Sequence, residues 1–350
     1  MMYITQNSAK YFLIKRIIRV VPLYWVMTLI RFALSPSPIY SQPFNWKLLF
    51  ESLFFIPGNI QPLYNIGWTL NHVMVFYIIF KLACLVNLKD RGKIAAAFIV
   101  TWVCSIQIFK LTYFYSPLPL EFILGIIAFE IIKRAHTRKS KNKQYGIIIR
   151  DVVCTILCVA SLWFITSYPA MTIIYKSGDW ELIRPAILGI PAMILVCAFC
   201  ILTKDKKAPE TLLFLGNIIL LCCFLHAYAE ASAKLLYMTI SGVSCLLWNI
   251  LVMKFQKLPW EKIYKFILML GNISFSCYLW NILVKEFGKL LLLKINLVSA
   301  DHNYYLMDAP NFIFMLASVL TTIAVGWVSY YFIEVKLSSW IRKAVLRKNA

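Results

Sequence analysis

Long apolar runs separated by short polar connections dominate the sequence. Runs of about 20 residues can cross a hydrocarbon core ~30 Å thick as helices. A helix satisfies its own backbone hydrogen bonds in lipid, and no segment alternates in the manner of a membrane strand. We therefore expect an all-α, polytopic membrane protein that forms a single integral-membrane domain over residues 1–350. About ten transmembrane helices are predicted at roughly 17–34, 67–87, 94–112, 118–133, 150–168, 184–203, 211–230, 234–253, 265–284 and 311–333.

Composition supports the membrane interpretation and changes the meaning of the charge. The chain is 61% hydrophobic with a mean hydropathy of +0.73, and 36 Lys and Arg against 15 Asp and Glu give a net charge of +21. In a soluble protein such a charge would suggest nucleic acid. Here the cations fall in short connections between apolar runs, so we expect membrane lipid as a partner and no nucleic acid.

The distribution of Lys and Arg predicts the orientation. Most of them lie in or beside the connections that we assign to the cytoplasm, namely residues 1–16, 89–93, 133–150, 204–207, 254–262 and the tail from Lys336. The positive-inside rule then places both termini in the cytoplasm. The opposite connections, Ser35–Ile66, Ser167–Leu182 and Lys285–Pro310, are longer and rich in Pro, Asn, Ser and aromatic residues. They suit a large substrate on the outer side or reflect simple tolerance of long loops.

The stretch Tyr11–Trp25 combines a basic helix start with the beginning of an apolar span. Arg16 and Arg19 are three residues apart, so they project from one side of a helix, with Lys15 beside them. Guanidinium groups in this arrangement can bind a phosphate-bearing molecule that arrives from the cytoplasm. The alternative is anchoring of the helix end by the positive-inside effect alone.

Polar residues open the span that begins at Gly67. Trp68 and Asn71 accompany His72 there, and polar groups entering hydrocarbon are costly unless they face the interior of the bundle. His72 is a candidate catalytic base near neutral pH, or alternatively an interfacial histidine in an aromatic belt. His226, near the outer end of its own span, is a second candidate base, although lying on the same side does not make the two histidines neighbours.

Glu121 begins the span at 118–133, where it is either a carboxylate of a substrate pathway or an acid favoured by the helix dipole. The ten cysteines lie mostly inside apolar runs, and Cys197-x-x-Cys200 lacks nearby ligands, so we interpret them as small core residues and predict no metal site. P-loop, dinucleotide, zinc-protease and nucleophile-elbow motifs are missing from the sequence. The residues alone leave a transporter and a membrane transferase as alternatives.

Several motifs taken in order resemble the family 3 membrane acyltransferases, a bacterial group that O-acetylates surface polysaccharides. The similarity extends over most of the chain and is carried by the following segments: Ser8–Phe12, Lys15-Arg16-x-x-Arg19-x-x-Pro22-Leu23-Tyr24-Trp25, Phe54–Pro57, Gly67–Asn71, Phe76-Tyr77, Leu120-Glu121-Phe122-x-x-Gly125, Gly189–Ala192, Leu215–Asn217, Gly271–Leu279 and Tyr331–Glu334.

The resemblance implies transfer of an acyl group, usually acetyl from acetyl-CoA, to a hydroxyl of a lipid-linked or exported glycan at the bacterial inner membrane. Such a protein is an acyltransferase for groups other than aminoacyl groups, with acyl-CoA as a donor substrate and no bound cofactor. Arg16 and Arg19, with Lys15 beside them, match the basic pair expected to bind the CoA phosphates. Trp68, Asn71, Tyr77 and Glu121 are then the candidate residues for binding the substrate.

The sequence departs from the family pattern at the expected catalytic base. The family carries an Arg, ten residues and then a His in a first span, and none of the four histidines here has that spacing. We expect that the sequence lacks the first two spans, so whether Met1 is the native start is open, and that His72 or His226 supplies the base. Val73, Asn281 and Lys336 stand where Glu, His and Pro are common. A catalytically inactive member that binds or passes lipid-linked sugars is therefore the alternative, and generic secondary transport is a third hypothesis.

Overall fold

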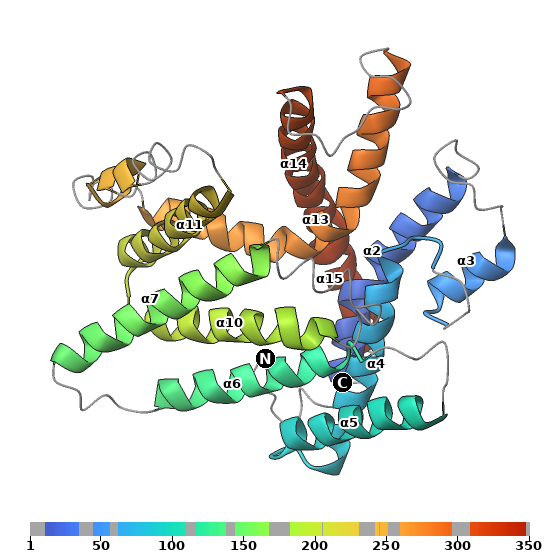
Figure 1. Ribbon diagram of the computed structural model, residues 1–350. Helices are drawn as coiled ribbons and strands as arrows, with labels where there is room; N and C mark the ends of the chain where they lie inside the picture. Colours follow the sequence, from blue (N-terminus) through green and yellow to red (C-terminus); the bar gives the residue numbers. More distant parts are fainter. Residues whose placement is uncertain are drawn as a thin grey trace. The chain divides into compact units, whose positions relative to one another are not determined.

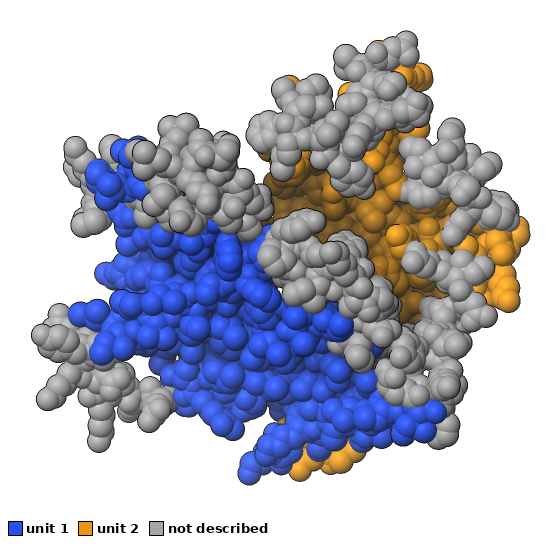
Figure 2. Space-filling view, viewed as in Figure 1, with its two compact units in different colours: residues 1–3, 89–265 blue, residues 4–88, 266–350 orange. Residues whose placement is uncertain are grey.

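The computed structural model is helical throughout the residues that it describes and divides into two compact units (Figures 1 and 2). Unit 1 comprises residues 1–3 and 89–265, and unit 2 comprises residues 4–88 and 266–350. The described residues are 11–34, 45–56, 62–109, 117–137, 144–167, 183–204, 206–230, 242–244, 246–250, 260–295 and 309–347.

The described residues of both units are helical for the most part. The elements of unit 2 are α2 (Phe12–Ala33), α3 (Trp46–Leu53), α4 (Gly67–Val86), most of α13 (Trp260–Lys294), α14 (Ala309–Ser329), the π-helix η3 (Tyr330–Leu337) and α15 (Ser338–Arg347). Those of unit 1 are α5 (Arg91–Phe109), α6 (Leu120–Thr137), α7 (Gln144–Thr166), the π-helix η2 (Pro185–Gly189), α10 (Ile190–Leu202) and α11 (Ala208–Glu230).

Among the residues that the structure describes, five helical stretches are long and apolar enough to cross a membrane: Gly67–Val86, Ile147–Thr166, Pro185–Leu202, Glu261–Lys294 and Ile313–Ile341. Each coincides with one of the ten predicted spans. The remaining spans and the cytoplasmic placement of the termini stay predictions. Most of the span predicted at 234–253 lies outside the described residues. The expected single domain also stays a prediction.

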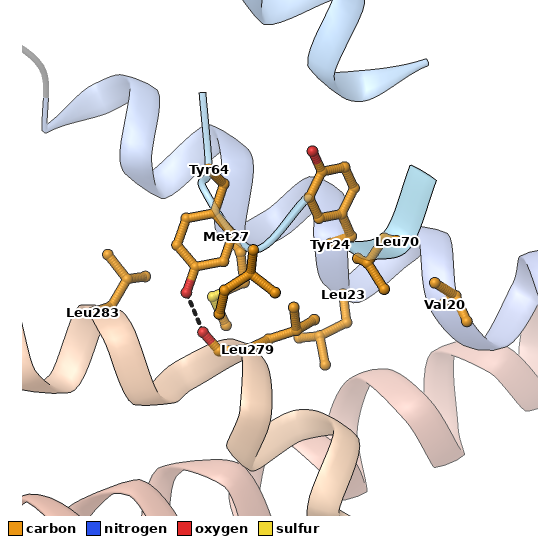
Figure 3. Packing of buried hydrophobic residues seen from close by; sticks show 9 residues of the cluster. Val20, Leu23, Tyr24, Met27, Tyr64, Leu70, Leu279 and Leu283 are labelled. Carbon is orange, nitrogen blue, oxygen red and sulfur yellow. Dashed lines mark hydrogen bonds between the residues drawn. The ribbon is translucent and has the colours of Figure 1, made fainter. Parts of the chain in front are cut away.

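A stripe on α2 forms the core of unit 2. Val20, Leu23, Tyr24 and Met27 recur at helical spacing and are buried, so that one face of α2 is apolar. Figure 3 shows this stripe packed against the rest of the cluster, which is completed by Tyr64, Ile66, Leu70, Leu279 and Leu283. The Tyr64 hydroxyl donates a hydrogen bond to the backbone oxygen of Leu279, which links the segment before α4 to α13.

The short helix α3 ends in a Schellman motif that lacks the usual glycine. The N–H of Ile56 donates to the carbonyl of Glu51 (2.8 Å), and that of Phe55 donates to Ser52 (3.3 Å). Phe55 occupies the left-handed position with a φ of 57°, a conformation that costs a residue with a Cβ about 1–2 kcal/mol. Its ring packs at 4.9 Å from the ring of Tyr24. The aromatic contact offsets this backbone strain.

Unit 1 packs α7 against α10 and α11. Its apolar cluster is made of Cys154, Cys158, Ala198, Leu202 and Ile218, so two of the cysteines are small core residues. Polar contacts join the connection 204–207 to the neighbouring helices α6 and α7. There the Lys206 ammonium lies 2.6 Å from the Asp151 carboxylate, and Lys204 donates to the last carbonyl oxygens of α6 at Ala135 and His136. These basic residues therefore satisfy a helix end and a partly buried acid as well as contributing positive charge.

Candidate functional site

Arg16, on α2, lies beside two aromatic rings. Its guanidinium carbon is 5.5 Å from the ring centroid of Phe12 and 5.7 Å from that of Tyr77 on α4. The two rings meet edge to face at 6.0 Å. A guanidinium held over ring faces still has its N–H groups in its own plane, where they can bind a carboxylate or phosphate. The structure therefore brings together two of the predicted site residues, Arg16 and Tyr77.

Arg19 has a different environment, one turn further along α2. Its Nε lies 3.7 Å from Oε2 of Glu334, whose side chain is 3% exposed whereas that of Arg19 is 51% exposed. The Ser276 hydroxyl on α13 donates a hydrogen bond to the other carboxylate oxygen, Oε1. A buried carboxylate needs a charged partner and hydrogen bonds. Arg19 supplies the charge and Ser276 one hydrogen bond, whereas Oε2 accepts no hydrogen bond from the described residues.

The connection from η3 to α15 also contacts the backbone of α2. The Ser338 hydroxyl donates to the carbonyl of Ile18 at 2.9 Å, next to Arg19. Glu334 and Ser338 are buried, whereas Val335, Lys336 and Leu337 between them are exposed. Polar side chains from the C-terminal part of the chain thus hold the basic end of α2 at two consecutive residues.

His72 is held by its own helix. Its Nδ1 lies 2.8 Å from the carbonyl oxygen of Trp68, and the two rings meet edge to face at 5.9 Å. A carbonyl oxygen only accepts hydrogen bonds, so Nδ1 carries the proton, and the neutral ring then has Nε2 unprotonated. The half-buried imidazole is chemically suited to accept a proton at Nε2.

The two faces of α4 separate His72 from Tyr77. Leu70 and Tyr77 face the α2 cluster, since Leu70 belongs to it and Tyr77 packs against it. His72 and Tyr77 are five positions apart, which corresponds to a rotation of about 140° and a rise of about 7.5 Å along the helix. The structure therefore does not bring His72 to the ring pair that holds Arg16. Asn71, next to His72, is partly buried.

A polar group of residues lies near the beginning of α4 in unit 2. The Thr69 hydroxyl and the Tyr278 hydroxyl are 3.0 Å apart. Arg31 is only 5% exposed and interacts electrostatically with Glu286 and with Tyr64. Burial raises the pKa of Tyr64 well above its ordinary value, so its hydroxyl stays protonated as a donor.

Glu121 belongs to unit 1, in the first turn of α6. Its Oε1 lies 3.3 Å from Nε of Arg184, the residue before η2, and both side chains are about one-third exposed. A Cβ at Gly189 would come within 2.7 Å of Leu124 and 3.7 Å of Glu121, so this glycine allows the close approach of the two elements. Glu121 is thus an ion-paired carboxylate, and its role in binding substrate stays a prediction.

Two further candidates are placed only in outline. Lys15 is exposed on α2 beside Arg16. His226 lies in α11, but its side chain is outside the described residues. Within the described ranges, no group of three or more His, Cys, Asp or Glu side chains could hold a metal ion.

Sequence reasoning did not assign Ser276, Glu334 or Arg184 to a site. Ser276 and Glu334 belong to the segments Gly271–Leu279 and Tyr331–Glu334 that carry the family resemblance, which was the available signal. Ser276 contacts Glu334 across 58 positions of the chain, and Ser338, which follows Glu334, contacts Ile18 on α2 across 320 positions. Local spacing does not encode such contacts. No motif in the sequence singled out Arg184.

Comparison with known proteins gives one partial similarity. The chain is 30% identical over 132 residues to the exopolysaccharide production protein ExoZ of Rhizobium meliloti (strain 1021). The match covers 33% of this chain and only 40% of ExoZ. No family model and no solved structure matches the chain. The similarity is therefore to part of a protein of exopolysaccharide production, and the acyltransferase family stays a prediction from the motifs.

Proposed function

We propose that the protein is a membrane O-acyltransferase of exopolysaccharide production. It moves an acyl group, normally acetyl, from acyl-CoA to a hydroxyl of a cell-surface or lipid-linked glycan at the bacterial inner membrane. The ordered motifs and the partial similarity to ExoZ support this class. The observation that carries the proposal is Arg16, whose guanidinium contacts the rings of Phe12 and Tyr77 one turn from Arg19.

The donor binds at the basic end of α2 by its phosphates. Arg16 is ordered by the two rings before the donor arrives, so little side-chain entropy is lost on binding. Arg19 adds a second guanidinium on the same side of the helix, and the exposed Lys15 adds long-range attraction for the anion. Charge-assisted hydrogen bonds to phosphate contribute about 1.5–3 kcal/mol each.

The acceptor hydroxyl is activated by a histidine. Nε2 of His72 removes the hydroxyl proton, the oxygen attacks the thioester carbonyl, and a C–O bond forms as the C–S bond breaks. The proton then passes to the CoA thiolate, so the histidine returns to its starting state. Trp68 and Asn71 beside His72 are the proposed acceptor-binding residues of unit 2. In unit 1, Glu121 is a separate candidate for binding substrate, and His226 is the second candidate base.

Transfer of labelled acetyl from acetyl-CoA to a lipid-linked saccharide tests the proposal in membranes that contain the protein. We expect Arg16→Ala to raise the KM for acetyl-CoA at least tenfold. The control is Arg134→Ala, which removes an exposed arginine at the end of α6. An unchanged KM in Arg16→Ala would exclude the donor-site assignment.

A second function is binding of lipid-linked saccharides without acyl transfer. It is favoured by Val73 and Asn281, which stand where the resembled family commonly has Glu and His. General base catalysis is worth about 10²–10⁴-fold, so a member without a working base would retain little activity. Saccharide binding by the wild type together with no turnover of acetyl-CoA would favour this function over the first.

A further inference from the structure

The two arginines of the basic pair are held by different means. Arg16 contacts aromatic rings, and no described carboxylate lies within ion-pairing distance of it. Arg19 instead faces the buried carboxylate of Glu334. A role in anchoring α2 to the membrane would not require a buried acid behind one of the cations.

The contact with Glu334 leaves most of the Arg19 guanidinium available. The contact joins Nε, the innermost nitrogen of the guanidinium, to Oε2 at 3.7 Å, and the arginine side chain remains half exposed. The two terminal Nη groups form the other edge of the planar fork, which is the edge that binds phosphate in a bidentate manner. An acid at Nε therefore orients the fork without occupying it.

Glu334 is held by a hydrogen bond from Ser276, and the segment that carries it is joined to α2 through Ser338. Ser276 on α13 donates to its Oε1, and Ser338, four residues later, binds the Ile18 carbonyl beside Arg19. The carboxylate lies within the π-helix η3, a type of irregular helix that is frequent at functional sites. The acid is therefore a rigid support that the C-terminal part of the chain supplies to α2.

We propose that Glu334 is a positioning residue of the donor site, which holds Arg19 so that its Nη groups bind a phosphate of acyl-CoA. The inference rests on the proposed function and adds the segment Tyr330–Ser338 to that site. Glu334 neutralises one of the three cations at this end of α2, and the remaining positive charge still attracts the donor. Without Glu334, the long side chain of Arg19 is ordered only on binding, which weakens the complex.

Binding of CoA to the purified full-length chain in detergent tests this role. We expect Arg19→Ala to raise the Kd about tenfold or more, because a charge-assisted contact to phosphate is lost. Glu334→Gln keeps the size of the side chain and should raise the Kd about three- to tenfold. In the Arg19→Ala background, Glu334→Gln should have no further effect on the Kd, since its action passes through Arg19.

Matched variants separate positioning from stability. Ser276→Ala should weaken CoA binding in the same direction as Glu334→Gln, whereas Glu261→Gln, at an exposed acid in the first turn of α13, should leave the Kd unchanged. A Glu334→Gln protein that binds CoA as tightly as the wild type, or more tightly, overturns the positioning role while the proposed function stands. If Glu334→Gln weakens CoA binding equally in the wild type and in the Arg19→Ala background, the positioning role is also overturned. A wild type that binds no CoA overturns the proposed function and this inference together.

Discussion

Gly67 lies against the hydroxyl of Tyr24 so closely that a Cβ at position 67 would overlap that oxygen. Tyr24 is completely buried in the core stripe of α2, and Gly67 is the first residue of α4. The close approach fixes the start of α4 against α2. The residues that follow on α4, from Trp68 to Tyr77, take their positions from this contact.

Gly67→Ala should therefore destabilise the protein. The new methyl group would also meet Pro62 at 3.0 Å, so either Tyr24 or the start of α4 must move, at a cost of about 1–3 kcal/mol. Thermal unfolding in detergent measures the change. Gly271→Ala is the control, since nothing lies within 4 Å of a Cβ there and alanine favours the helix of α13. Equal stability of Gly67→Ala and Gly271→Ala would contradict the close contact.

The strained backbone at Phe55 can be separated from the packing of its ring. Phe55→Ala removes the contact with Tyr24 and keeps a Cβ at a φ of 57°, whereas Phe55→Gly removes both the ring and the strain. We expect the glycine variant to be the more stable of the two by about 1 kcal/mol, although both should be less stable than the wild type. The order of the two melting temperatures checks this, and an alanine variant more stable than the glycine variant would refute it.

Arg31 should be important for stability rather than for donor binding. It is buried, and removing it leaves Glu286 without its main electrostatic partner. Glu286 is only partly buried, so the cost should fall below the ~3–5 kcal/mol of a fully buried pair. Arg31→Ala should still lower the melting temperature, and adding Glu286→Gln should recover part of the loss. Lys93→Ala, at an exposed pair with Asp90, is the control and should change stability by less than about 1 kcal/mol. No recovery in the double variant would mean that the two side chains do not act as a pair.

Substitutions of His72 test whether its Nε2 acts as the catalytic base. Asparagine can replace the Nδ1 donor to Trp68, and glutamine is closer in reach to Nε2, but neither accepts a proton at neutral pH. We therefore expect both variants to lower kcat for acetyl transfer about 10²–10⁴-fold with little change in the Kd for CoA. Retained activity in His72→Asn would assign the histidine a structural role, and the same pair of measurements on His226 variants would then be decisive.

Much of the fold was predictable from hydrophobic pattern alone. The all-helical class follows from the apolar runs, and five predicted spans coincide with helices of sufficient length. The basic start of α2 and the polar start of α4 were also recognisable, because each depends on residues close together in the sequence. The cytoplasmic side of the basic end remains a prediction from charge distribution.

The partners of the charged residues were not predictable. Arg19 and Glu121 look like free charges in the sequence, yet each has an ion-pair partner near a π-helix, Glu334 and Arg184 respectively. A π-helix changes the direction of side chains relative to the regular 3.6-residue period, so helical spacing does not indicate which residue faces inward. Helical spacing predicts that His72 and Tyr77 lie on different faces of α4. It does not predict which of these faces contacts α2.

The acetyl content of the exopolysaccharide shows whether the protein transfers acyl groups to the glycan. It is measured by NMR on polymer from cells that lack the gene and from the same cells complemented with the wild type or with Arg16→Ala. We expect the O-acetyl signals to be lost without the gene, to return with the wild type and to be reduced with Arg16→Ala. Identical acetylation in all of these polymers would rule out the acyltransferase function.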